Sequence, residues 1–184
     1  PKLITPTPQK FHAHSLHFEP SKKASMITRK FQNTKDLKVG CILDNFSYSA
    51  FKFEANFFQL SVDKYKEELD DLQPDLLFIE SAWRGKDGLW GRKVGHADRE
   101  VIEILQWCKD KNVPTIFWNK EDPVHFKSFL NVAKLFDYVF TTDMDCIQRY
   151  KQSLNHDRVH LLPFAFQPKL HNPISEFERI KGLC

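Results

Sequence analysis

Short apolar runs alternate with amphipathic segments from Leu37 onward, and this alternation restricts the fold more than any other feature of the sequence. Apolar runs bounded by polar or turn residues predict strands at 37–43, 56–60, 76–79, 113–118, 138–141 and 159–162. Between them, apolar residues at helical spacing predict helices at 46–55, 63–72, 98–111, 123–135 and 143–154. This order of elements predicts an α/β domain with a doubly wound, mostly parallel, Rossmann-like sheet covered on both faces.

The chain divides near Leu37 into a basic lead segment and a domain. Its 184 residues are 41% hydrophobic, which suits one packed core. Residues 1–36 carry seven cationic side chains against two acidic ones, an excess typical of solvated arms. We therefore predict a linker or peripheral segment at 1–36 and a Rossmann-like domain at 37–184. The basic segment also suits a weak peripheral contact with an anionic lipid or polymer.

Composition excludes several classes of partner. The formal net charge of +3 is too small to argue for a nucleic-acid partner. No apolar run approaches the roughly 20 residues that cross a bilayer, so we expect no transmembrane segment. Four cysteines show neither zinc nor disulfide spacing, which favours reduced thiols in a cytoplasmic protein: Cys41, Cys108, Cys146 and Cys184.

Three histidines of the lead segment have a spacing that metal ligands use. His12, His14 and His17 include an alternating pair, and alternate residues of a strand share a face. They stand in the basic, Pro-containing segment rather than in the domain, so we expect no bound metal.

Polar side chains gather where the predicted strands end, and in an open parallel sheet the carboxyl ends of the strands form the ligand-binding edge. Four of these side chains are candidate acids or bases: Asp44, Glu80, Asp122 and His125. The others are candidate binding residues: Ser47, Tyr48, Ser81, Trp83, Arg84, Gly85, Asn119, Lys120, Glu121 and Thr142. Loops are polar in any case, and for Asp98 and Asp143 we expect helix capping rather than chemistry.

Familiar nucleotide and nucleophile motifs are absent from these loops. The residues after the first strand lack the glycines that let a backbone approach a pyrophosphate. The sequence also contains neither a Gly-Lys-Ser/Thr loop nor a Gly-x-Ser-x-Gly turn. A dehydrogenase, a simple NTPase and an α/β-hydrolase are therefore not expected.

Motifs at the predicted edge resemble those of a bacterial family, the spore-maturation protein B-like glycosyltransferases. Three of them occur in order: Glu80-Ser81-Ala82-Trp83-Arg84-Gly85, Trp118-Asn119-Lys120-Glu121-Asp122-Pro123-Val124-His125-Phe126 and Phe140-Thr141-Thr142-Asp143. The likeness runs from Leu37 to the C-terminus. It includes two motifs near the end of the domain: Leu162-Pro163-Phe164-Ala165 and His171-Asn172-Pro173.

This resemblance implies a GT-B architecture, in which two Rossmann-like domains face each other across a cleft. The first domain contacts the acceptor and the second carries most contacts to a sugar nucleotide, with no metal or further cofactor. Since the chain stops at Cys184, where the second domain is expected to begin, we expect an N-terminal domain that is inactive alone.

The resemblance predicts the acceptor-side domain of a sugar-nucleotide-dependent glycosyltransferase that modifies a cell-envelope or surface polymer. Trp83 is suited to stacking on a sugar, and Arg84 or Lys120 to holding an anionic acceptor or a diphosphate. The sequence does not single out one base among the four candidates. Two other hypotheses remain open: a non-catalytic module that binds a glycan or a protein, and a flavodoxin-like regulatory domain, which needs more than Asp44 to form an acidic pocket.

Overall fold

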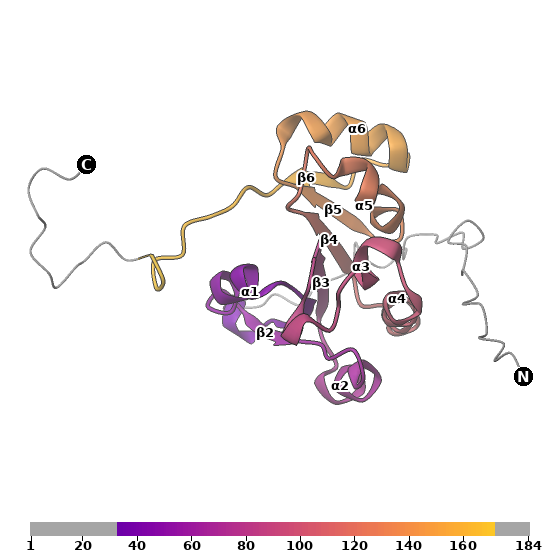
Figure 1. Cartoon of the computed structure of the whole chain (residues 1–184). Helices are drawn as coiled ribbons and strands as arrows, with labels where there is room; N and C mark the ends of the chain where they lie inside the picture. The colour runs from indigo at the N-terminus through magenta and orange to yellow at the C-terminus, as the bar shows by residue number, and fades with distance from the viewer. Residues whose placement is uncertain (1–32, 172–184) are drawn as a thin grey trace, which may run out of the picture.

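A computed structural model describes residues 33–171, which form a six-stranded, fully parallel sheet with the order β2-β1-β3-β4-β5-β6 (Figure 1). The strands are β1 (Lys38–Ile42), β2 (Asn56–Gln59), β3 (Leu76–Glu80), β4 (Thr115–Asn119), β5 (Tyr138–Thr141) and β6 (Val159–Leu161). The predicted α/β, Rossmann-like class is confirmed, and each strand lies within two residues of its predicted limits. This strand order places a switch point between β1 and β3, because the chain leaves these neighbouring strands in opposite directions.

Five main helices connect the strands: α1 (Asn45–Phe51), α2 (Tyr65–Leu72), α4 (Arg99–Lys111), α5 (Phe126–Ala133) and α6 (Met144–Leu154). Gln73, Asn112 and Asn155 end α2, α4 and α6 in the left-handed conformation, as C-terminal caps commonly do. Asp143 caps α6 as predicted, since its carboxylate accepts the Asp145 N–H at 2.7 Å. Asp98 occupies the N-cap position of α4, but its side chain makes no capping hydrogen bond, so that prediction is wrong.

The connection between β3 and α4 contains structure that the sequence did not predict. It includes the short 3-10 turn η4 (Lys86–Gly88) and a single helical turn, α3 (Lys93–His96). A further 3-10 turn, η3 (Thr34–Asp36), precedes β1. The helix predicted at 123–135 runs only from Phe126 to Ala133, and Pro123 lies in the turn before it. The Asp122–Pro123 peptide bond is cis.

The two faces of the sheet are covered unequally. Helices α2, α4, α5 and α6 bury the larger core on one face, whereas α1 covers the β1–β3 side of the other face. Right-handed crossovers explain this, because only the step from β1 to β2 runs in one direction and all later steps run in the other. Within residues 33–171, the expected cover on both faces is therefore incomplete at β5 and β6, whereas Trp118 of β4 is buried on the α1 face and its ring lies 5.5 Å from the Phe51 ring of α1.

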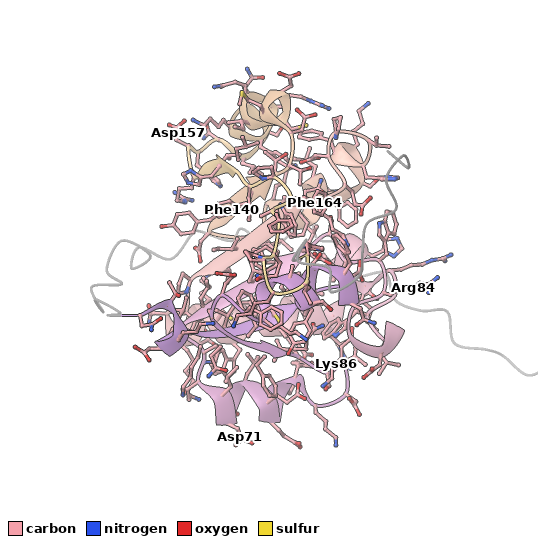
Figure 2. The ribbon with its side chains drawn as sticks, turned by 90° about the vertical axis from the view of Figure 1, so that its left-hand side faces the viewer. Asp71, Arg84, Lys86, Phe140, Asp157 and Phe164 are labelled. Atoms are coloured by element: carbon pink, nitrogen blue, oxygen red, sulfur yellow. The ribbon has the colours of Figure 1, made fainter. Side chains whose placement is uncertain are left out.

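On the α1 face, residues Leu162–His171 form a segment that we call the strap. Trp118 Nε1 donates to the Leu162 carbonyl at 2.9 Å, and the Phe164 ring lies 5.4 Å from the Trp118 ring. Farther along, Gln167 Nε2 donates to the Ala50 carbonyl at 2.9 Å. Figure 2 looks onto this face and shows Phe140 and Phe164 near its centre. The strap therefore links the end of β6 to the helix on the opposite half of the sheet.

Other sequence-based expectations meet the structure only in part. Cys41, Cys108 and Cys146 are free and buried, whereas Cys184 and the three histidines of the lead segment lie outside the described residues. No helix within 33–171 is long and apolar enough to cross a membrane. Within the same range, no group of three or more His, Cys, Asp or Glu side chains is arranged to hold a metal ion.

Candidate functional site

The loops that follow β1, β3, β4 and β5 contact one another along the carboxyl edge of the sheet. Asp44 after β1 bonds the loop after β3, and the Lys120 N–H after β4 donates to Ser81 Oγ at 3.0 Å. Thr142 after β5 lies 3.5 Å from the Lys120 carbonyl through its hydroxyl. The structure therefore brings together the segments that carry all of the candidate residues, with the switch point among them.

At the switch point, three charged side chains form a cluster that we call the ion triad: Asp44, Glu80 and Lys120. Lys120 Nζ lies 2.7 Å from Asp44 Oδ2 and 3.0 Å from Glu80 Oε1. The Asp44 N–H also donates to Glu80 Oε1 at 2.6 Å. Glu80 has no exposed surface, so no substrate can touch its carboxylate in this conformation. The triad holds three loops together rather than presenting a charge to solvent.

Burial and charge pairing act in opposite directions on these groups. Burial raises the pKa of the Glu80 carboxyl above its ordinary value, although Lys120 opposes the shift. Burial would also raise the pKa of Asp44, but hydrogen bonds from Lys120 and three backbone N–H groups hold it below its usual range. Desolvation would lower the pKa of Lys120, yet the two carboxylates raise it. Asp44 and Lys120 are therefore a charged pair at neutral pH.

One more polar group of the site is enclosed next to the triad. The Ser47 side chain in α1 is buried, and its hydroxyl makes no well-aligned hydrogen bond with any residue of the described range. Glu80 Oε2 is also buried, and it too lacks a well-aligned hydrogen bond within the described range. The two groups still interact with each other, because the Ser47 hydroxyl acts as a hydrogen-bond donor that opposes the rise in the pKa of the Glu80 carboxyl.

Asp44 fixes the backbone of the loop that follows β3. Its carboxylate accepts the N–H groups of Trp83, Arg84 and Gly85 at 3.1, 2.9 and 2.7 Å. Trp90 holds the same loop from below, because its backbone N–H donates to the Arg84 carbonyl and its indole N–H to the Leu60 carbonyl, both at 2.9 Å. The chain therefore anchors this loop rigidly from both sides.

The anchored loop presents Trp83 and Arg84 at the surface. The Trp83 side chain is 46% exposed, and its ring meets the His125 ring at 5.2 Å and the Phe129 ring at 5.7 Å, both edge to face. Arg84 projects from the edge of the sheet in Figure 2. Trp83 is thus a large aromatic surface that two neighbouring rings keep in one orientation.

Asp122 belongs to a second network, on the face covered by α5 and α6. Asn119 Nδ2 donates to Asp122 Oδ1 at 2.8 Å and lies 2.9 Å from the Tyr150 hydroxyl. Thr141 Oγ1 donates to Asp122 Oδ2 at 2.6 Å. Burial raises the pKa of the Asp122 carboxyl above its ordinary value, although hydrogen bonds from Thr141 and Tyr150 oppose the shift. Both Asp122 oxygens are occupied, and Asn119 is fully buried.

Thr141 and Tyr150 are the members of this network that the sequence did not single out. Thr141 follows the inward-facing Val139 at strand spacing, so its burial was readable from the alternation in β5. Tyr150 is one helical turn from the buried Cys146 in α6, where an aromatic side chain predicts packing and not a polar contact. No local signal in the sequence points to its hydrogen bond.

The remaining candidates divide by accessibility. Tyr48 is turned toward β2, where its hydroxyl lies 3.5 Å from the Phe57 carbonyl. Glu121 and Thr142 are partly exposed at the edge, as is His125 beside Trp83. The groups of the site that a ligand can reach are therefore few: Trp83, Arg84, Glu121, His125 and Thr142.

Comparison with curated proteins finds a partial likeness to spore protein CgeB of Bacillus subtilis (strain 168). The two sequences are 32% identical over 73 residues, which is 40% of this chain and 23% of that protein. The match thus covers less than a quarter of the length of its relative. No family model and no solved structure matches the chain. The chain is therefore similar, over part of its length, to one bacterial spore protein.

Proposed function

We propose that this domain is the acceptor-side half of a sugar-nucleotide-dependent glycosyltransferase that modifies a cell-envelope or surface polymer. One observation carries the proposal: a rigid loop at the switch-point edge presents Trp83 to solvent. Aromatic rings offer a sugar a large apolar surface at low entropic cost. The motif resemblance gives the reaction class and the class of acceptor, and the partial likeness to a spore protein agrees with a bacterial relative.

Within this function, His125 is the group best placed to act as general base. It is partly exposed and its ring lies 5.2 Å from the Trp83 ring, whereas Glu80 is buried and the oxygens of Asp44 and Asp122 are occupied. A sugar stacked on Trp83 would bring one hydroxyl to the imidazole. His125 would take that proton as the acceptor oxygen forms a bond to the anomeric carbon and the donor's bond to the nucleoside diphosphate breaks.

Arg84 supplies the positive charge at this edge, because Lys120 is committed to the ion triad. A guanidinium group can hold a carboxylate or phosphate in a bidentate manner. We assign Arg84 to an anionic group of the acceptor or to the departing diphosphate. The donor itself would be held mainly by a second domain of a longer protein.

The test is a sugar-nucleotide turnover assay on a longer protein that contains this domain, with the 184-residue chain as a control. We expect turnover only in the longer protein, a fall in kcat of about 10²-fold or more for His125→Gln, and a raised acceptor KM for Trp83→Ala. Leu89→Ala is the matched control, because Leu89 is a 52% exposed apolar residue of the same connection. An absence of turnover with any nucleotide sugar, in a longer protein that is folded, would overturn the proposal.

A second candidate function is supported by the fixed state of the carboxylates. Asp44, Glu80 and Asp122 all serve internal contacts, which suits a module that binds a glycan and performs no chemistry. In that case the 184-residue chain binds oligosaccharides through Trp83, and the longer protein binds them without consuming a sugar nucleotide. The same assay, followed by saturation-transfer NMR with an oligosaccharide, separates the two functions.

A further inference from the structure

Helix α1 and the strap expose several large apolar side chains on the same side of the molecule (Figure 2). Phe46 in α1 is 65% exposed, and Phe164 and Phe166 in the strap are 54% and 62% exposed. The Phe46 and Phe164 rings lie 6.0 Å apart, so the helix and the strap share one surface there. Leu170 continues it along the strap. We call these four residues the apolar surface, and a group of this kind is typical of a contact with a protein or a membrane.

Three lysines from separate elements meet beside the apolar surface, at Phe53 just after α1. Lys52 Nζ lies 5.1 Å and Lys169 Nζ lies 5.0 Å from the centre of the Phe53 ring. Lys35 in η3 donates to the Phe53 carbonyl. All three lysines are exposed, and we call them the lysine cluster. They come from η3, the end of α1 and the strap, so only the tertiary structure brings them together.

Nearby carboxylates leave the lysine cluster with a positive excess. None of its three ammonium groups forms an ion pair with another residue of the range 33–171. Neither α1 nor the strap contains an acidic residue. Of the two acidic residues next to the cluster in the chain, Asp36 is exposed and Glu54 accepts Gln167 Nε2 at 2.7 Å. Like charges held close together repel, so an anionic partner is favoured at this place.

We propose that α1 and the strap bind the surface of a bilayer that contains anionic lipids. The apolar surface enters the headgroup region, and the lysine cluster binds lipid phosphates. Lysine suits this position, because its flexible stem keeps the ammonium group in the polar layer while apolar neighbours are buried. An anionic polymer would match the lysines but would leave the phenylalanines in water, so the two features together favour a lipid surface.

This contact leaves the candidate site accessible. Trp83 packs on His125 and Phe129 on the side of α5, whereas the apolar surface lies on the side of α1. The inference also does not rest on glycosyltransferase activity, because its test needs no sugar nucleotide.

The test is co-sedimentation of the 184-residue chain with lipid vesicles. We expect binding to vesicles of phosphatidylcholine and phosphatidylglycerol in equal amounts, and at least about tenfold weaker binding to phosphatidylcholine alone. Replacing two lysines together, Lys52→Gln with Lys169→Gln, should weaken binding to the anionic vesicles at least about tenfold. Phe166→Ser should weaken it about tenfold as well. The substituted residues are exposed, so the core stays intact.

Matched variants separate this surface from the general charge of the chain. Lys127→Gln with Lys134→Gln removes the same charge from exposed positions in and directly after α5. Leu89→Ser removes a 52% exposed apolar side chain from the connection between β3 and α4. Both controls should bind the anionic vesicles nearly as tightly as the unchanged chain. The lead segment is the same in every variant, so its cationic side chains do not affect the comparison.

Three results would overturn the proposal. The first is an absence of binding to the anionic vesicles. The second is an equal loss for the lysine pair and its control, because total charge would then account for the binding. The third is a loss for the lysine pair without any loss for Phe166→Ser, because the partner would then be a polyanion and not a bilayer.

Discussion

Asp44 illustrates how a carboxylate at the carboxyl edge of a parallel sheet can stabilise the fold. It accepts three backbone N–H groups and one ammonium group, which leaves no oxygen for a substrate. Charge-assisted hydrogen bonds of this kind are stronger than neutral ones and favour the ionised carboxylate. Its residue type and position suggested acid–base chemistry, but its bonds assign it to holding Trp83 and Arg84 in place.

Stability should depend on pH through Asp44. Its folded-state pKa lies below the unfolded value of about 3.9, so its stabilisation is present above that value and is lost as the pH falls through the folded pKa. We expect Asp44→Asn to lower the free energy of unfolding by about 2 kcal/mol at pH 7. This difference should shrink steadily below pH ~4, as measured by urea unfolding at each pH.

Asp71→Asn is the control for this measurement, because Asp71 is exposed at the end of α2 (Figure 2). It should change stability by no more than about 0.5 kcal/mol at any pH. A difference between wild type and Asp44→Asn that stays constant down to acid pH would show that the Asp44 charge does not stabilise the fold.

Lys120 should matter to stability because Glu80 is buried beside it. Lys120→Met leaves the Glu80 carboxylate without its counter-charge, which costs about 3–5 kcal/mol for a buried pair. Glu80→Gln in the same chain should recover at least half of that loss, since it removes the uncompensated charge. The exposed Lys127→Met on α5 should be nearly neutral.

Chemical denaturation of the single and double variants checks this prediction through the coupling energy of the cycle. Losses that simply add, with no recovery in the double variant, would mean that Glu80 and Lys120 do not depend on each other.

At the scale of elements, the connection from β3 to α4 is the part of the chain that builds the surface of the site. Trp90 is fully buried beneath it, and Gly85 lies so close that a Cβ atom would meet the Trp90 ring at 2.7 Å. Gly85 also has φ 62° and ψ −160°, a region that only glycine adopts readily. The loop is therefore compact because one large ring and one residue without a side chain fit together.

Gly85 and Gly88 form a matched pair for testing this packing. Gly88 also has a positive φ, 76°, but its Cβ position is open. Gly88→Ala should therefore cost only the backbone strain of about 1 kcal/mol, whereas Gly85→Ala should cost a further ~1–3 kcal/mol from overpacking on Trp90. Thermal unfolding of both variants measures the difference. Equal losses would mean that the Trp90 contact does not hold the loop.

At the scale of the whole molecule, the strap connects two halves of the α1 face that no helix joins within residues 33–171. It reaches from β6 to α1 and covers Trp118, whose side chain is only 2% exposed. The Phe164 ring packs on Trp118 from the strap, because it contacts the rings of both Trp118 and Phe46. The strap thus covers Trp118 on the α1 face of the sheet, beside the helix that the crossover from β1 to β2 places there.

Phe164→Ala should loosen the strap over Trp118. We expect the Trp118 indole N–H, which donates to Leu162, to exchange with solvent at least about tenfold faster, because local opening becomes easier. The Trp90 indole N–H donates to Leu60 on the other face and serves as an internal reference. Phe166→Ala is the matched variant, since Phe166 is 62% exposed and contacts His171 rather than Trp118.

Hydrogen exchange followed by NMR measures both indole groups in one sample. Unchanged exchange at Trp118 in the Phe164 variant, or equal acceleration at Trp90, would show that the strap does not protect this ring.

Much of the fold was predictable because it depends on local patterns. The strand at 76–79 is a mostly buried apolar run, and the strand at 138–141 alternates partly buried and buried residues. The end of the helix at 98–111 agrees with Asn112, a residue type that accepts a left-handed conformation. The predicted edge also follows from topology alone, since parallel strands place their carboxyl ends together. The chemistry of each side chain at that edge does not follow, because Asp44 and His125 both lie between a strand and a helix at this edge but have different neighbours in space.

The sequence by itself therefore determined the order of elements, the fold class and the edge at which polar residues gather, since each depends on periodicity and chain connectivity. Only the tertiary structure decided that Asp44, Glu80 and Lys120 are a closed triad, that Asp122 is bound by Thr141, and that Trp83 stays accessible. These outcomes depend on contacts between residues up to 76 positions apart. Such contacts are set by side-chain packing and burial, which no local pattern encodes.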